Sequence, residues 1–158
     1  MTRLPDCDDP LFDPSITVRL ECKKLRDDAV IPTKKRFTDV GYDVSSVDAY
    51  VVPAYGTVSV DTGIALSAPP GFYYTVDGRS SLWSKGILPF RGIIDATYTG
   101  PLIVGLFNMT PQPYHINKGD RIAQLILSPI IHADIETVTE FSPRYNQRGN
   151  NGFGSSGR

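Results

Sequence analysis

The sequence has no apolar run long enough to cross a membrane, and its first ten residues, MTRLPDCDDP, contain no apolar stretch of the signal-peptide type. Cysteine is also scarce. Cys7 and Cys22 have neither a Cys-x-x-Cys spacing nor a nearby histidine, so they indicate neither a metal site nor a redox pair. From these absences we expect a soluble, intracellular protein that does not act on membranes.

An excess of either charge is missing as well. The chain has 16 lysines and arginines against 17 aspartates and glutamates, a net charge of -1. Domains that bind nucleic acids usually carry a basic patch, so this balance argues against DNA or RNA as a partner. A small phosphorylated ligand is compatible with it, because such a ligand needs only a few well-placed cations.

Long segments with helical periodicity are also absent. Instead, 14 glycines and 13 prolines divide the chain into short segments rich in β-branched and aromatic residues. The segments that we expect to form strands are 16–20, 57–60, 71–76, 102–107, 122–127 and 134–141. The exception is RSSLWSKG (79–86), where we expect Ser80 or Ser81 to cap one short helix that Gly86 stops. The sequence therefore predicts an all-β fold with a single short helix.

The length of 158 residues suits one domain with one hydrophobic core. We expect this domain to span 16–142. It would lie between an N-terminal arm (1–15) and a glycine-rich C-terminal arm (143–158), both loosely ordered on their own.

Polar residues gather in five stretches, and loops that hold them are where an all-β scaffold usually carries its chemistry. In TDVGYDV (38–44), Asp43 offers a carboxylate or simply caps a turn. In DGRSS (77–81), the glycine, the cation and the two hydroxyls fit an anion cradle or an ordinary helix N-cap.

The third stretch, RGIIDATYTG (91–100), places Asp95 directly after two isoleucines. A carboxylate is costly to bury unless it has a partner or a task, such as deprotonating a water molecule. Alternatively, Asp95 begins a hairpin turn and Tyr98 belongs to the core. In the fourth stretch, KGDRIAQLIL (118–127), Gln124 is either a ligand-binding amide or a strut for a neighbouring loop. The fifth stretch is the tail, RGNNGFGSSGR (148–158), whose composition fits a linker or an arm that closes over a ligand.

Five sequences in this order, VGYDV, GRSSL, GIIDATYTG, GDRIAQLIL and RGNNGFGSSG, resemble the five motifs of the trimeric dUTPases. The resemblance runs from about Pro32 to Arg158. It implies a jelly-roll β-fold, a homotrimer and Mg²⁺-assisted hydrolysis of dUTP to dUMP and pyrophosphate. That reaction keeps uracil out of DNA and supplies dUMP for thymidylate synthesis.

The resemblance also assigns roles to residues around the base and the sugar. Asp95 matches the carboxylate that activates the attacking water, and Tyr98 matches the ring that packs under the deoxyribose and excludes a 2′-hydroxyl. The backbone around Gly92 and Ile94 matches the hairpin that reads the uracil edge, with Ile103 on its returning strand.

Other matched positions concern the phosphates, the metal and the lid. The positions that match phosphate-binding residues are Arg79, Ser80, Ser81, Gln124, Arg148, Ser155 and Ser156. Asp43 matches a carboxylate associated with the water shell of the Mg²⁺, which is held mainly by the triphosphate. Phe153 matches the ring that covers the uracil, and Gly154 lets the arm approach the phosphates. In the family this arm closes over a neighbouring subunit's active site.

The chemistry of the reaction is compatible with these roles. Hydrolysis of a phosphoanhydride requires charge neutralisation, a positioned water and a base. Mg²⁺ keeps several waters and can remain on the triphosphate without a protein cage. Cytosine reverses the donor and acceptor pattern of uracil, whereas the methyl group of thymine must be refused by close packing.

Three positions depart from the family pattern: Val40 stands where alanine is usual, Thr97 where an acid is common, and Pro101 where glutamate is frequent. None of them is assigned to chemistry. We expect them to affect subunit contacts or local rigidity more than activity.

Three other functions compete with this interpretation. A dCTP deaminase needs a glutamate on the strand after the third motif, but that strand reads LIVGLFN. A jelly-roll interaction module would not require Asp95, Tyr98 and Gln124 at matching spacing. An inactive relative is disfavoured because Asp95, Arg79 and Arg148 are all present.

Overall fold

The computed structural model of the chain describes residues 18–142. The two predicted arms, 1–15 and 143–158, lie outside these residues and stay predictions. The same holds for the site residues predicted in the C-terminal arm, which are Arg148, Phe153, Gly154, Ser155 and Ser156.

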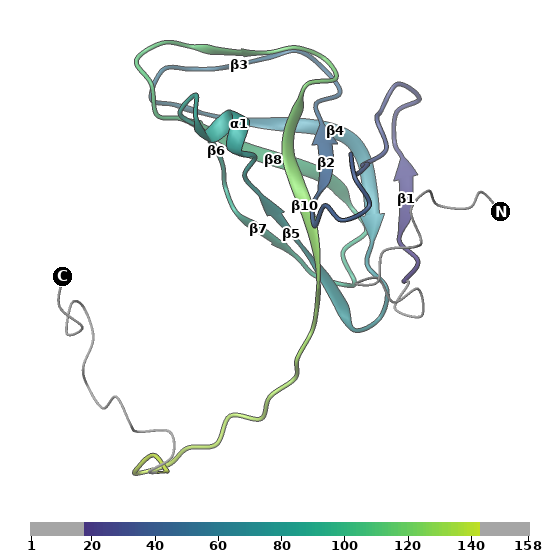
Figure 1. Cartoon of the computed structure of the whole chain (residues 1–158), viewed down its shortest axis with the longest axis vertical. Helices are drawn as coiled ribbons and strands as arrows, with labels where there is room; N and C mark the ends of the chain where they lie inside the picture. Colours follow the sequence, from purple (N-terminus) through teal and green to yellow (C-terminus); the bar gives the residue numbers. More distant parts are fainter. Residues whose placement is uncertain (1–17, 143–158) are drawn as a thin grey trace.

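The described chain forms two four-stranded antiparallel sheets and one two-stranded sheet, with a single short helix, α1 (Ser80–Trp83) (Figure 1). The first sheet has the order β1-β4-β8-β6, and its strands are β1 (Glu21–Lys24), β4 (Thr57–Ser67), β6 (Ile87–Pro89) and β8 (Pro101–Asn108). The second sheet has the order β2-β10-β5-β7, and its strands are β2 (Tyr42–Ser45), β5 (Phe72–Asp77), β7 (Gly92–Ile94) and β10 (Arg121–Pro129). The small sheet pairs β3 (Tyr50–Val52) with β9 (Tyr114–Ile116). The predicted all-β, jelly-roll-like fold with one short helix is confirmed.

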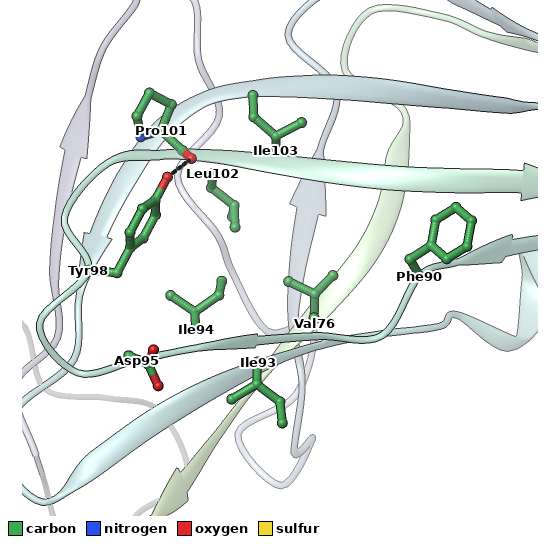
Figure 2. Close-up of a pocket in the computed structure, with 10 residues that line it drawn as sticks. Val76, Phe90, Ile93, Ile94, Asp95, Tyr98, Pro101, Leu102 and Ile103 are labelled. Atoms are coloured by element: carbon green, nitrogen blue, oxygen red, sulfur yellow. Dashed lines mark hydrogen bonds between the residues drawn. The ribbon is translucent and has the colours of Figure 1, made fainter.

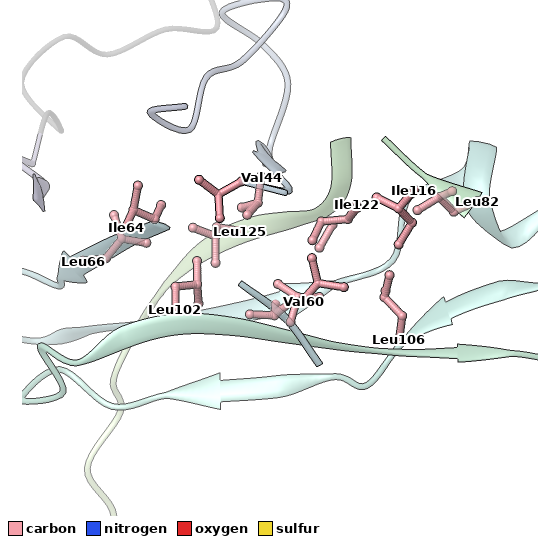
Figure 3. Packing of buried hydrophobic residues seen from close by; sticks show 14 of the residues in the cluster. Val44, Val60, Ile64, Leu66, Leu82, Leu102, Leu106, Ile116, Ile122 and Leu125 are labelled. Atoms are coloured by element: carbon pink, nitrogen blue, oxygen red, sulfur yellow. The ribbon is translucent and has the colours of Figure 1, made fainter. Parts of the chain in front are cut away.

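The hydrophobic core lies between the two large sheets, because alternate residues of each strand point inward. In β8, Leu102, Val104 and Leu106 are buried, and Ile122 and Leu125 of β10 are buried in the same cluster (Figure 3). This packing fixes the strand ends and loops that carry the polar residues.

Three of the predicted strands, 57–60, 102–107 and 122–127, lie within β4, β8 and β10, and the fourth, 71–76, lies within β5 except at residue 71. The prediction for 16–20 is wrong where it can be tested, because residues 18–20 precede β1 and pair with no strand.

The predicted strand at 134–141 is also wrong. The chain leaves the sandwich after β10 and runs away from it (Figure 1), so no strand of the described chain lies beside this segment. Its apolar residues are exposed, with Ile135 at 98% and Phe141 at 72%. The alternation is present in the sequence, but this segment pairs with no strand among residues 18–142.

The predicted helix cap requires a correction. Arg79, not a serine, is the N-cap of α1, with the extended backbone (φ -103°, ψ 132°) that a cap needs, and no side chain caps the helix by a hydrogen bond. Ser80 and Ser81 already lie in the first turn. Gly86 has a φ of +73°, which agrees with its predicted role in stopping the helical segment.

One crossing between the sheets positions the site. After β6 the chain leaves the first sheet at Pro89 and enters the second sheet at Gly92 as its edge strand, β7. Strands β7 and β8 therefore face each other without pairing. No helix within residues 18–142 is long and apolar enough to span a membrane.

Candidate active site

A cavity of about 330 Å³ opens between β7 and β8, and we call it the β7–β8 pocket (Figure 2). Five predicted site residues line it together: Gly92, Ile94, Asp95, Tyr98 and Ile103. The other lining residues are Val76, Phe90, Ile93, Pro101 and Leu102.

Backbone groups of β8 are free to bind a ligand in this pocket. Strand β6 pairs with β8 only over Ile87–Pro89, and the Phe90 N–H then donates a last bond to the Gly105 carbonyl at 2.8 Å. At the other end, the Tyr98 hydroxyl donates to the Pro101 carbonyl at 3.0 Å. The backbone N–H and C=O groups of successive residues in a strand point to alternate edges. Those of Ile103 therefore point to the same edge as the carbonyls of Pro101 and Gly105. A donor and an acceptor therefore face the pocket side by side.

Asp95 lies at the end of β7, in the turn that leads to β8. The Tyr98 N–H donates to the Asp95 carbonyl at 3.0 Å, so Asp95 begins a turn as the hairpin-turn interpretation expected, but the turn is not a hairpin because β7 and β8 do not pair. Tyr98 is 46% exposed and does not belong to the core. Tyr98 lies close over Gly100, because an added Cβ there would be 2.6 Å from the Tyr98 hydroxyl and would displace the ring.

The Asp95 carboxylate is exposed in the single chain, so the burial cost that singled it out in the sequence does not arise there. Among residues 18–142 no side chain bonds or pairs with it. This carboxylate is free to hold a water molecule or a ligand.

The second group of site residues lies at the other end of the second sheet. We define the arginine cluster as Asp43, Arg79 and Arg121. Arg79 donates from Nε to Asp43 Oδ1, and Arg121 donates from Nη1 to Asp43 Oδ2, both at 2.8 Å. Arg79 Nη1 also donates to the Arg121 carbonyl at 2.9 Å. Asp43 therefore lies in β2 and holds two guanidinium groups, and it caps no turn.

Sequence reasoning missed Arg121. The signal was available, because the fourth motif, GDRIAQLIL, places this cation three residues before Gln124. Only the pairing of β10 with β2, which sets Gln124 opposite Asp43, brings Arg121 to the carboxylate.

Gln124 acts as the predicted strut. Its Nε2 donates to the Gly78 carbonyl at 2.6 Å and so ties β10 to the loop before α1. An added Cβ at Gly41 would collide with the Gln124 amide, which explains the glycine in the first motif.

A second cavity of about 540 Å³ adjoins the arginine cluster. Its lining includes three cations, Arg79, Lys85 and Arg121, together with Ser81. Ser80 and Ser81 are exposed and their hydroxyls do not cap α1, so they are available to an anion. Arginine forks and hydroxyls are the groups that phosphate oxygens prefer.

The two groups do not meet within one chain. Ile94, which precedes Asp95, pairs with Tyr74 of β5, and Arg79 follows five residues after Tyr74. Asp95 is therefore level with Tyr73, six residues before Arg79, which at about 3.3 Å per residue is on the order of 20 Å along the sheet. The residues that line the β7–β8 pocket include no lysine or arginine.

The all-β fold, the backbone groups of the β7–β8 pocket and the arginine cluster are together of the kind that a nucleotide-binding protein needs for a planar base and for phosphates. The family model described as dUTPase matches residues 27–157. The chain belongs to the dUTPase family.

Relatives and solved structures agree with this assignment. The chain is 45% identical over 136 residues to the deoxyuridine 5′-triphosphate nucleotidohydrolase of Paramecium bursaria Chlorella virus 1, covering 85% of this chain and 95% of that protein. It is 42% identical over 129 residues to the Candida albicans enzyme of the same name, covering 81% of each chain. Among solved structures, the Staphylococcus bacteriophage 80alpha dUTPase with dUPNHPP is 31% identical with a TM-score of 0.81, covering 90% of this chain and all of that one.

Proposed function

We propose that this chain is a dUTP diphosphatase that hydrolyses dUTP to dUMP and pyrophosphate. The family membership and the high coverage of its relatives support this function. The observation that carries it in the structure is the β7–β8 pocket. There a free carboxylate, Asp95, lies beside Tyr98 at one end of the stretch of β8 whose edge toward the pocket is unpaired.

The base is recognised by backbone atoms. The N–H and C=O of Ile103 match the O4 acceptor and N3–H donor of uracil, and cytosine presents the opposite pattern. The backbone at Gly92 and Ile94 faces the same base from β7. Tyr98 packs under the deoxyribose and leaves no room for a 2′-hydroxyl.

Asp95 acts as the general base. It takes a proton from a water molecule as that water attacks, and the P–O bond between the α- and β-phosphoryl groups breaks. If the water attacks the α-phosphorus, pyrophosphate leaves and dUMP carries the new oxygen. If the water attacks the β-phosphorus, dUMP leaves and pyrophosphate carries the new oxygen. Both courses require the water to lie beside Asp95.

The phosphates are bound by Arg79, Ser80, Ser81 and Gln124 of a second copy of the chain, within a homotrimer. Two observations support this arrangement. The β7–β8 pocket has no cation of its own among the described residues, and a triphosphate needs several. In addition, Ile131 and Ile135 are exposed beyond β10, where a neighbouring subunit would cover them.

The C-terminal arm closes the site in this proposal. Arg148, Ser155 and Ser156 bind the phosphates, Phe153 covers the uracil, and Gly154 lets the backbone approach. Closure of the arm excludes water other than the attacking one.

Mg²⁺ is the metal that fits the donors. Residues 18–142 contain no group of three or more acidic, histidine or cysteine side chains that could hold an ion. The ion therefore depends mainly on phosphate oxygens. The Asp43 carboxylate has about four lone-pair sites, and two arginine contacts leave it able to accept a bond from a metal-bound water. When bound, the ion neutralises charge on the phosphates. A solved dUTPase from phage phi11 of S. aureus, 27% identical with a TM-score of 0.73, is described with a structural Mg(II) ion.

The test is product analysis with purified protein, Mg²⁺ and four nucleotides. We expect pyrophosphate from dUTP and not from dCTP, dTTP or UTP. Equal turnover of all four would contradict the specificity, and no turnover of any would favour a binding module.

A further inference from the structure

Phe90 lines the β7–β8 pocket, and neither the motifs nor the proposed mechanism gives it a role. It lies in the short connection between β6 and β7, and its side chain is 58% exposed. Figure 2 places its ring at one end of the pocket and Tyr98 at the other.

The position of the ring is fixed by β8. The Phe90 N–H donates to the Gly105 carbonyl, and the ring lies over Gly105, where a Cβ would be 2.8 Å from Phe90 Cδ2. The missing side chain at Gly105 is what lets the ring lie against the strand. The same hydrogen bond is the last one before the chain leaves the edge of β8 on its way from β6 to β7, so the ring lies where the free edge of β8 begins.

The residues at the two ends of the pocket indicate how a bound nucleotide is oriented in it. Asp95 and Tyr98 lie together at one end, and the proposed function places the phosphate and the sugar there. Ile103, whose backbone reads the base, lies between that end and Gly105 along β8. The base therefore extends toward Phe90.

We propose that Phe90 is a specificity-determining residue whose ring closes the base end of the β7–β8 pocket and contacts the uracil. The inference rests on the proposed function, because it uses the orientation of dUTP in this site. A flat apolar ring there adds contact area for a planar base and leaves no space for a larger one. The Phe90 side chain would then exclude the thymine methyl group sterically, in addition to the packing of the backbone.

The experiment compares the wild-type chain with Phe90→Ala on dUTP and dTTP. We expect the KM for dUTP to rise about tenfold with kcat little changed, and the preference in kcat/KM for dUTP over dTTP to fall by a similar factor, the size typical of one missing apolar contact. Phe90→Leu, which keeps much of the volume, should give intermediate values. An unchanged KM and an unchanged preference in Phe90→Ala would overturn the proposal, as would a fall in kcat alone.

Two controls separate this role from a structural one. Tyr55→Ala removes an equally exposed ring, 65% exposed, in the connection between β3 and β4, and should leave KM and the preference unchanged. Thermal melting and particle size of each variant report folding and assembly. If Phe90→Ala changed assembly without changing KM or the preference, the ring would be a subunit contact and the proposal would be wrong.

A second variant tests the contact with β8 directly. Gly105→Ala should displace the ring and alter KM in the wild-type background, but have little further effect in Phe90→Ala, because the clash is with the ring. Equal effects in both backgrounds would contradict the assigned contact. Absence of dUTP turnover in the wild type would instead refute the proposed function itself.

Discussion

At the scale of single residues, the surroundings of Asp95 differ from those that its motif predicts. Asp95 was singled out because a buried carboxylate needs a task, yet it is exposed in the single chain and is free for a different reason. Its turn with Tyr98 holds the carboxylate at the open end of the pocket, without a partner among residues 18–142.

Replacing Asp95 with asparagine should remove the base and keep the shape. We expect kcat for dUTP to fall roughly a thousandfold, the usual size of a general-base contribution, with dUTP binding largely retained. Steady-state kinetics and calorimetric titration with dUTP would measure the two effects. Asp134→Asn, an exposed carboxylate beyond β10, is the matched control. A near-normal kcat in Asp95→Asn would show that another group activates the water.

The arginine cluster gives a second prediction at this scale. Arg121 is linked to the proposed phosphate site through Asp43, whose other oxygen holds Arg79 at 2.8 Å. We therefore expect Arg121→Ala to raise the KM for dUTP about tenfold, in line with the loss of a charge-assisted hydrogen bond, and Arg121→Lys to recover part of the loss.

Coupling decides whether Arg121 is a positioning residue. In a double-mutant cycle, Arg121→Ala should have much less effect on KM once Asp43 is already alanine. If the two effects simply add, Arg121 acts independently of Asp43 and contacts the substrate itself.

At the scale of elements, an ion-pair group joins segments that are distant in sequence. Asp28 pairs with Arg26 at 2.9 Å and with Lys118, and Arg26 also pairs with Asp48. Lys118 lies in the turn before β10, so the group ties the loop after β1 to the start of the strand that carries Gln124.

This group predicts a dependence of stability on pH. Hydrogen bonds from Lys118 and Arg26 lower the pKa of Asp28 to about 2, from an ordinary value of 3.8. A carboxyl whose pKa is depressed in the folded state stabilises the fold above its unfolded pKa, and the stabilisation is lost as the pH falls through the folded one. The melting temperature should therefore fall between about pH 4 and pH 2, and fall less in Asp28→Asn. Identical pH profiles for the two proteins would mean that these exposed pairs do not contribute to stability.

The elements also show which parts of the fold a sequence can predict. Strands β4, β5, β8 and β10 are long enough for alternation to appear, whereas β3, β6, β7 and β9 have three residues each and cannot display a period. Asp43 was expected in a loop because glycine precedes it closely. Gly41 is instead needed where the Gln124 amide packs against the backbone.

At the scale of the whole molecule, the site residues of residues 18–142 form two groups, and the order of the motifs could not reveal this. The separation of Asp95 from Arg79 depends on which strands pair and in what register, which is set by contacts distant in sequence. The failed strand at 134–141 has the same cause, because its apolar residues find no partner within residues 18–142.

Mixed assemblies test whether two chains share a site. Asp95→Asn and Arg79→Ala should each be nearly inactive alone, but assemblies formed after mixing or co-expression should regain activity. Recovery is expected because some sites then combine an intact Asp95 from one chain with an intact Arg79 from another. Turnover of dUTP after subunit exchange is the measurement. No recovery in assemblies shown to be mixed would place both residues of a working site in one chain.

The crossing from β6 to β7 leaves one edge of β8 free, and this free edge has an evolutionary consequence. In the proposed function the N–H and C=O of Ile103 read the base, so the selection of uracil would not depend on the identity of that side chain, which is 48% exposed. Point substitutions can drift at this position without changing what the enzyme accepts. An insertion or deletion of one residue in β8 would turn these backbone groups away from the pocket. We therefore expect related proteins to vary the residues of this strand and to keep its length.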